Sequence, residues 1–401
     1  TEITDINTAR SKPTGAGDNT AALVAGGGTP PATGATENWD GTSWTEVADL
    51  GTARSANDSG AGTTNAMVIA SGTDPSGNLT EEWTAPATIR QFNIGDIYYN
   101  ADSSSGAIKY VGYGTGAWAS GGALNTAKVG GAAGGTATAL IYAGGYDGTS
   151  PGATDTVETY DGSTWSETTE INTARTALGN GLGTASTAVL AVAGSPNRTI
   201  VEEWDGSSWS EEPDINTGRS ELASTGTTTA GLAAGGTTGT ASNTVESWNG
   251  TAWSEITEIN TARRQTRLGG TNTAALLVSG EVPPNSFKDE TEEWDGSSWS
   301  EKSDLNAAKS NAATSGTSTA MLAAGGNTPP FTVNTENWDG SSWTEVANLA
   351  GARAGSSTTP AGTSLAALTA GGSNPSAPGV TTTGEEWNVP TELKTLASTN
   401  A

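Results

Sequence analysis

The chain has 401 residues and a formal charge of −26, from 43 acidic and 17 basic residues. This charge argues against nucleic acid and anionic membranes as partners, because both bind clusters of Lys and Arg. The chain has no His and no Cys, which excludes Ser-His-Asp triads, cysteine nucleophiles and zinc fingers. We therefore expect no catalytic residues, no metal and no cofactor. We also expect no membrane insertion, since the apolar runs are too short to span a bilayer.

Three sequence markers recur eight times in a fixed order. The first is a basic residue that ends an Asn-Thr-Ala-Arg type segment, at Arg10, Arg54, Lys128, Arg175, Arg219, Arg263, Lys309 and Arg353. The second is a short apolar run that ends in Gly, such as 230–236. The third is an aromatic residue preceded by Glu two positions earlier, at Trp39, Trp83, Tyr160, Trp204, Trp248, Trp294, Trp338 and Trp387. Most successive aromatics are 44 to 46 residues apart.

This period predicts β-propeller blades of four antiparallel strands. The apolar runs have strand length, and Asp-Gly or Asn-Gly between the paired aromatics of a unit is hairpin turn chemistry, as at 205–206. We therefore expect an all-β fold over residues 1–401. The expected blades are 7–49, 50–123, 124–170, 171–214, 215–258, 259–304, 305–348 and 349–401.

The first ten residues, TEITDINTAR, match residues 254–263, SEITEINTAR, which follow the second aromatic of a unit. We expect residues 1–6 to be the outer strand of the last blade, beside the strand that ends at Trp387, so that one ring of eight blades is closed. A second aromatic follows the first in most units, but in the second unit it is displaced to Trp118 by an insertion. A competing interpretation ends one propeller near Trp83 and starts a six-bladed one near Trp118. It would leave residues 1–83 as two blades with unpaired edges, which sheets avoid.

The order of Arg, apolar run with double Gly, Glu-x-Trp/Tyr-Asp and Trp resembles the kelch repeat, and this resemblance covers nearly the whole chain outside 84–117. It implies a propeller fold. The near-identical units, rich in Thr, Ser and Gly, also resemble kelch-like structural proteins of marine bacteriophages. The segment 94–118 looks like a hairpin module of phage tail and fibre proteins.

The repeated charges and aromatics are interpreted first as structural. We expect the basic residues, among them Arg10, Arg54, Arg175, Arg219, Arg263 and Arg353, to pair with the Glu before the aromatic, among them Glu37, Glu202, Glu246, Glu292 and Glu336. An anion-binding ring of Arg is the functional alternative. The aromatics Trp39, Trp204, Trp248, Trp294 and Trp338 are expected to pack between blades, with sugar stacking as the alternative.

The segments that differ between units are the better candidates for recognition. The loops after the apolar runs vary on a constant scaffold, as in recognition surfaces, although neutral drift would give the same pattern. Their candidate contact residues are Tyr146, Asp147, Arg198, Phe287, Lys288 and Phe331.

The insertion 84–117 is expected in the second blade as a hairpin with the turn ADSSSG. Its aromatics Phe92, Tyr98, Tyr99, Tyr110 and Tyr113 are candidates for docking another subunit. Packing on its own blade is the alternative.

These patterns predict a non-enzymatic structural or adhesion protein of a phage virion, in a tail, neck or fibre. The expected partners are other virion proteins, copies of itself, and a host surface glycan or protein, but not nucleic acid. The alternative is a secreted or cell-surface propeller that binds glycans.

Overall fold

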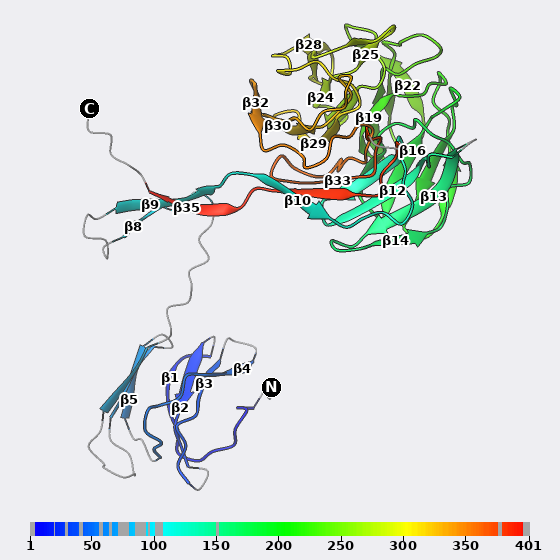
Figure 1. The fold of residues 1–401 in the computed structure, drawn as a ribbon. Coiled ribbons are helices and arrows are strands. Elements are labelled where there is room, and N and C mark those ends of the chain that lie inside the picture. The colour runs from blue at the N-terminus through cyan, green and yellow to red at the C-terminus, as the bar shows by residue number, and fades with distance from the viewer. Residues whose placement is uncertain are drawn as a thin grey trace, which may run out of the picture. The chain divides into compact units, whose positions relative to one another are not determined.

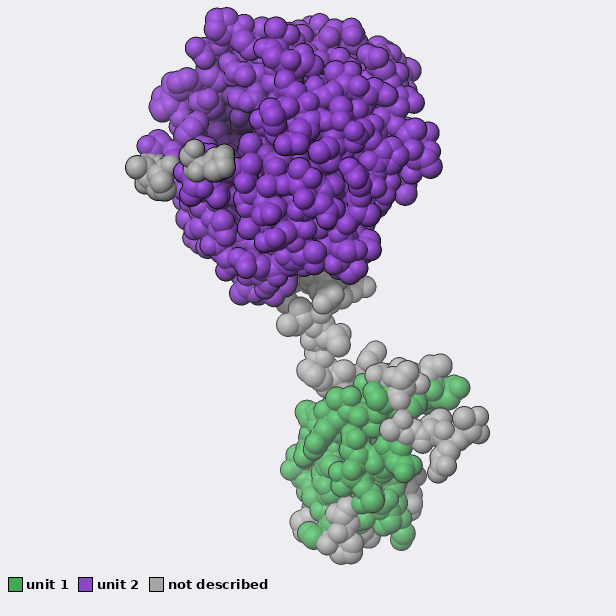
Figure 2. Space-filling view, turned by 90° about the vertical axis from the view of Figure 1, so that its right-hand side faces the viewer, with its two compact units in different colours: residues 1–93 green, residues 94–401 purple. Residues whose placement is uncertain are grey.

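The structure, a computed structural model, divides the chain into two compact units: unit 1, residues 1–93, and unit 2, residues 94–401 (Figure 2). This division differs from the single domain expected, and its boundary lies between Trp83 and Trp118, where the competing interpretation divides the chain. The structure describes residues 5–19, 21–28, 31–39, 43–55, 59–63, 66–70, 80–84, 94, 97–100, 107–149, 152–375 and 379–395.

Unit 1 contains two antiparallel sheets of the repeat type (Figure 1). The first sheet has four strands and the second has three among the described residues. The strands are β1 (Thr14–Gly17), β2 (Ala22–Ala25), β3 (Thr36–Trp39), β4 (Trp44–Val47), β5 (Ser59–Thr63), β6 (Ala66–Ala70) and β7 (Thr80–Thr84).

Unit 2 contains five four-stranded antiparallel sheets in chain order, each with its strands in sequence order (Figure 1). The first two are built from β11 (Ala132–Thr136), β12 (Ala139–Tyr146), β13 (Ala153–Tyr160), β14 (Trp165–Thr168), β15 (Leu182–Ala185), β16 (Ala188–Val192), β17 (Val201–Trp204) and β18 (Trp209–Glu212). The third and fourth are built from β19 (Ala223–Thr227), β20 (Ala230–Ala234), β21 (Val245–Trp248), β22 (Trp253–Ile256), β23 (Arg267–Gly270), β24 (Ala275–Val278), β27 (Thr291–Trp294) and β28 (Trp299–Glu301). The fifth has β29 (Ala313–Thr317), β30 (Ala320–Ala324), β31 (Thr335–Trp338) and β32 (Trp343–Val346). The expectation of all-β, four-stranded antiparallel sheets is confirmed.

The sixth sheet of unit 2 combines strands from its two ends. β34 (Gly384–Asn388) pairs with β33 (Ala366–Ala370) on one side and with β10 (Ala117–Gly121) on the other. The expected partner of this strand, residues 1–6, is therefore wrong, because β10 occupies that edge. A segment from far back in the sequence thus pairs with β34, but it is 117–121 and not 1–6.

The hairpin expected within the insertion is present, as β8 (Ile97–Asn100) paired with β9 (Ala107–Tyr113). It does not belong to the second sheet of unit 1, which corrects the predicted insertion in the second blade. Instead β9 also pairs with β35 (Thr391–Thr395), so the hairpin and the last described strand form one small sheet (Figure 1). A short two-stranded ladder, β25 (Glu281–Val282) and β26 (Ser286–Phe287), projects from the fourth sheet.

Neighbouring sheets of unit 2 pack face to face through buried apolar side chains. Ile141 of the first sheet lies in one cluster with Val189 and Trp204 of the second. Equivalent clusters join the second to the third sheet, the third to the fourth, the fourth to the fifth and the fifth to the sixth. Leu368 of the sixth sheet shares a cluster with Tyr142 of the first. The fold of unit 2 is thus propeller-like.

A circle of backbone hydrogen bonds also links the six sheets at their inner ends. Each sheet contributes the residue two positions after its repeated basic residue, except that in the second sheet Ala177 only accepts and the next residue donates. At four of these positions a non-glycine residue has a left-handed φ of 53° to 56°: Ala177, Glu221, Gln265 and Asn311. In each bond the backbone N–H of one sheet donates to a backbone carbonyl of another. The donor and acceptor residues are Leu178 and Gly130 (3.1 Å), Glu221 and Ala177 (2.9 Å), Gln265 and Glu221 (2.9 Å), Asn311 and Gln265 (2.8 Å), Gly355 and Asn311 (2.9 Å), and Gly130 and Gly355 (3.0 Å).

Candidate functional site

The repeated charges form ion pairs within each sheet. Arg219, just before β19, donates to the carboxylate of Glu246 on β21 at 2.9 Å, and both side chains are fully buried. The other seven pairs are Arg10–Glu37, Arg54–Glu81, Lys128–Glu158, Arg175–Glu202, Arg263–Glu292, Lys309–Glu336 and Arg353–Glu385. The repeated basic residues are thus used internally, which leaves them unsuited to an external anion.

The Asn-Thr pair of the repeated segment also donates hydrogen bonds to this carboxylate. In the third sheet of unit 2 the backbone N–H groups of Asn216 and Thr217 donate to Glu246 at 2.7 and 3.3 Å. Burial lowers the pKa of the Arg219 guanidinium, and the neighbouring Glu246 opposes that shift. A buried carboxylate with this many donors holds the segment before β19 in place against β21.

In unit 2 the paired aromatics pack between sheets, as Trp204 and Trp209 do in the cluster that contains Ile141 of the sheet before. Trp204 and Trp209, whose ring centroids are 5.5 Å apart, are both buried, so neither face is free for a sugar. Trp118 pairs with Trp387 at 5.5 Å, and its indole N–H donates to Thr335 of the preceding sheet. In the same way Trp343 donates to Thr291 of the sheet before it. Trp118 is therefore the second aromatic of the sixth sheet of unit 2, not of the second repeat.

The predicted Asp-Gly turns are tied by the Asp side chain. Asp205 accepts from the N–H groups of Ser208 and Ser207 at 2.8 and 2.7 Å and from the Ser207 hydroxyl. These hydrogen bonds, that of the Ser208 N–H first, lower the pKa of Asp205 to about 2. Asn249 accepts the same set of bonds in the next sheet, so the position needs an oxygen acceptor rather than a charge.

The predicted loop residues lie on connections of four different sheets and are not brought together. Tyr146 is 37% exposed at the end of β12, and the adjacent Asp147 accepts hydrogen bonds from Thr149, which lower its pKa. Arg198 and Phe331 are half-buried on the connections of the second and fifth sheets. Phe287 lies half-buried on β26, and Lys288 forms an ion pair with Glu290 at 2.9 Å.

Of the insertion aromatics, Tyr113 is 43% exposed and Tyr110 is half-buried, both on β9. Tyr98 and Tyr99 lie on β8. Phe92 lies outside the described residues.

Unit 1 exposes an apolar position that is buried in every sheet of unit 2. Val68 on β6 is 42% exposed. The matching residues of unit 2 are all at most 1% exposed: Ile141, Leu190, Leu232, Leu276, Leu322 and Leu368. On the other side of unit 1, Val24 and Trp44 of the first sheet are half-buried, whereas Ala233 and Trp253 at the matching positions are buried. Between these two faces Leu23 packs on Met67 in the repeat's usual manner.

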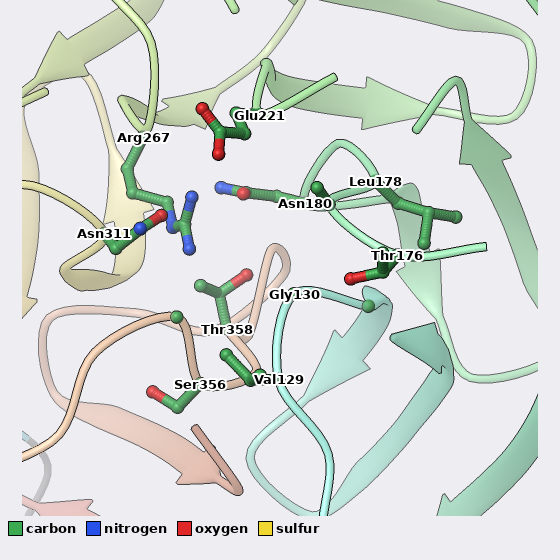
Figure 3. Close-up of a pocket in the computed structure, with 13 residues that line it drawn as sticks. Val129, Gly130, Thr176, Leu178, Asn180, Glu221, Arg267, Asn311, Ser356 and Thr358 are labelled. Carbon is green, nitrogen blue, oxygen red and sulfur yellow. The ribbon is translucent and has the colours of Figure 1, made fainter. Parts of the chain in front are cut away.

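A pocket of about 160 Å³ in unit 2 is lined by residues of the circle of backbone hydrogen bonds, among them Gly130, Glu221 and Asn311 (Figure 3). We call it the axial pocket. Its lining comes from all six sheets of the unit, and the polar side chains that line it include Asn180, Glu221, Arg267, Asn311, Ser356 and Thr358. In Figure 3 the side chains of Arg267, Asn180 and Glu221 converge on the middle of the pocket.

Arg267 is the most unusual residue of this pocket. It is 6% exposed, its side chain donates to its neighbour's carbonyl, Thr266, at 3.2 Å, and its Nε–H has no partner. Burial lowers its pKa to about 10, against the opposing effects of Tyr142 and Glu221, so the group is charged at neutral pH.

The sequence analysis missed Arg267 because it concentrated on what repeats and on the loops. A signal was present, however. Arg267 lies four residues after its repeated basic residue, where the first, third and fifth sheets of unit 2 have Ala132, Ala223 and Ala313. Within unit 2 this is the one charged residue at a position that is otherwise small, and it marks a departure from the scaffold.

No protein-family model matches the chain, and comparison with curated proteins gives no match. Among the described residues no helix is long and apolar enough to cross a membrane.

Proposed function

We propose that the protein is a non-enzymatic structural or adhesion protein that docks to further sheets of its own repeat type through unit 1. The observation that carries the proposal is the exposure of Val68, at a position buried in all six sheets of unit 2. In a repeat architecture, an apolar residue that is exposed where its equivalents are buried indicates a face without its neighbouring sheet.

The proposal takes unit 2 as a closed six-bladed propeller. The circle of six backbone hydrogen bonds supports closure, as does the packing of Leu368 against the first sheet. A closed ring has no free blade face, so unit 2 serves as the rigid scaffold that carries loops.

The two open faces of unit 1 are complementary to each other. One, with Val68, is the side that a sheet turns toward its successor, and the other, with Val24 and Trp44, is the side turned toward its predecessor. These are the two halves of the interface that unit 2 makes between its own sheets. A second copy of the chain therefore provides a fitting partner. The contact would be head-to-tail, and such contacts form a closed ring of copies when the rotation from one copy to the next allows it. Three copies would contribute six sheets, the number present in unit 2.

Sedimentation velocity of the full chain over a range of concentrations tests this proposal. We expect a self-associating species that reaches the mass of a trimer. Val68→Asp should shift the protein to monomer, because a charge would have to be buried. Ser210→Asp, on an exposed position of unit 2, is the matched control and should leave association unchanged. A monomer at every concentration, or an unaffected Val68→Asp variant, would contradict the proposal.

The resemblance to structural proteins of marine phages leads us to propose a virion as the site of this assembly, with host attachment by the loops of unit 2. Immunogold electron microscopy with an antibody against residues 84–117 should label a defined position on particles. Label only on cell envelopes or in the medium would favour a secreted protein.

Glycan binding is a second candidate, favoured by the exposed ring of Tyr146 beside Asp147. Aromatic faces and carboxylates are suited to sugar rings and hydroxyls. A glycan array with the wild-type chain and Tyr146→Ala tests it, and binding that the substitution does not weaken would exclude this residue.

A further inference from the structure

Arg267 lies in the axial pocket without the carboxylate partner that each repeated basic residue has. A buried unpaired charge is costly, whereas the alanine found at this position in three other sheets of unit 2 carries no such cost. Among the described residues no ion pair to Arg267 lies within salt-bridge distance. The guanidinium is therefore available to an anion that enters the pocket.

Two further groups in the pocket have unused hydrogen-bonding capacity. Asn180 is 6% exposed, and its Nδ2 donor has no partner. Glu221 Oε2 lies 3.3 Å from the guanidinium of Arg264 but makes no hydrogen bond. The pocket thus presents two donors, on Arg267 and Asn180, and one acceptor, on Glu221, all directed inward (Figure 3).

From this arrangement we infer that the axial pocket binds a small carboxylate that also carries a hydroxyl or ammonium group. The carboxylate would accept from Arg267 and Asn180, a charge-assisted contact of the kind that arginine makes well. The hydroxyl or ammonium would donate to Glu221. At about 160 Å³ the pocket is smaller than the 300 Å³ or more typical of drug-sized ligands, so the ligand has few heavy atoms.

Isothermal titration calorimetry of the full chain with glycolate, glycine and acetate at constant ionic strength tests this inference. We expect saturable binding of glycolate or glycine with a Kd on the order of 1 mM. Acetate, which has no donor for Glu221, should bind several-fold more weakly. The absence of saturable binding for all three at tens of millimolar would overturn the inference.

Arg267→Ala is the decisive variant, because Ala132, Ala223 and Ala313 occupy the same position in other sheets. It should weaken glycolate binding at least about tenfold. Without ligand it should melt at the same temperature as the wild type or higher, which separates loss of binding from loss of fold. Lys302→Ala removes one exposed positive charge from unit 2 and should bind as the wild type does. Equal binding by Arg267→Ala and the wild type would overturn the site.

Glu221→Ala distinguishes the two halves of the pocket. Ala177 has the same left-handed backbone in the second sheet, with a φ of 53°, so alanine fits there. The variant should still bind acetate but should no longer prefer glycolate over it. An unchanged preference would exclude Glu221 as the acceptor. These outcomes are independent of association through unit 1, since the pocket lies wholly in unit 2.

Discussion

The two units are built from the same repeat but give their sheets different neighbours. Residues 36–54 of unit 1 and 335–353 of unit 2 are nearly identical in sequence. Both contain the aromatic pair, and in both the Glu pairs with the basic residue that precedes the sheet. Yet Trp343 is 6% exposed and Trp44 is only half-buried. The sequence of a blade therefore determines its internal geometry, but burial of its faces depends on which sheets lie beside it. This dependence is the general property of repeat architectures.

The largest expected effect comes from the buried ion pairs of unit 2. Arg219→Met leaves Glu246 buried without its cation and should lower the free energy of unfolding of unit 2 by about 3–5 kcal/mol. Arg54→Met in unit 1 should cost less, because Glu81 is 23% exposed and can be hydrated. Urea denaturation of the two variants measures the difference.

Arg219→Lys is the matched control for that comparison, since Lys128 and Lys309 fill the same position in two sheets. Arg219→Lys should retain most of the free energy of unfolding that Arg219→Met loses. Equal destabilisation by Arg219→Met and Arg54→Met would remove the distinction between the units.

A smaller loss of stability is expected from a substitution in β10, the strand that completes the sixth sheet of unit 2. Trp118→Ala removes the packing on Trp387 and the hydrogen bond to Thr335, and should cost about 2 kcal/mol, since the ring is half-buried. Thermal unfolding of unit 2 should shift, while that of unit 1 should not. A shift in the unfolding of unit 1 alone would assign Trp118 to the second repeat after all.

Much of this arrangement can be predicted from the sequence. The repeat length, the Asp-Gly turns and the pairing of Arg219 with Glu246 follow from residues that recur at fixed spacing. The strand beside β34 could not be assigned in this way, because TEITDI at the N-terminus matches an outer strand as well as residues 117–121 do. The assignment depends on which sheet edge is free, a property of the whole fold. Arg267 was missed for a related reason: its environment is created by six segments that meet only after the sheets are assembled.

The smallest expected effect concerns the turns, where both units have the same Asp-Gly sequence. Asp205→Asn should not change the melting midpoint at neutral pH, since Asn249 makes the same hydrogen bonds. Below pH 4 the two proteins should diverge. The pKa of Asp205 is depressed to about 2, so its stabilising contribution is complete above the pKa of an unfolded Asp, about 3.9, and is lost as the pH falls toward 2. If the melting midpoints of both proteins change equally between pH 7 and pH 2, this account of the turn is contradicted.

The central claim, that residues 117–121 and not 1–6 complete the sheet of β34, can be tested by two cysteine pairs. Ala119 lies directly opposite Glu386 in the register of β10 and β34, and the chain has no other cysteine to compete. Thr1 would take that place in the single-ring interpretation, because it corresponds to Ser254, which lies opposite Ser247 on the equivalent strand. Directly opposed positions are close enough for a disulfide. We predict an intramolecular disulfide, measured by mass spectrometry of the oxidised full chain, in Ala119→Cys/Glu386→Cys and none in Thr1→Cys/Glu386→Cys. The reverse result would contradict the division of the chain into two units.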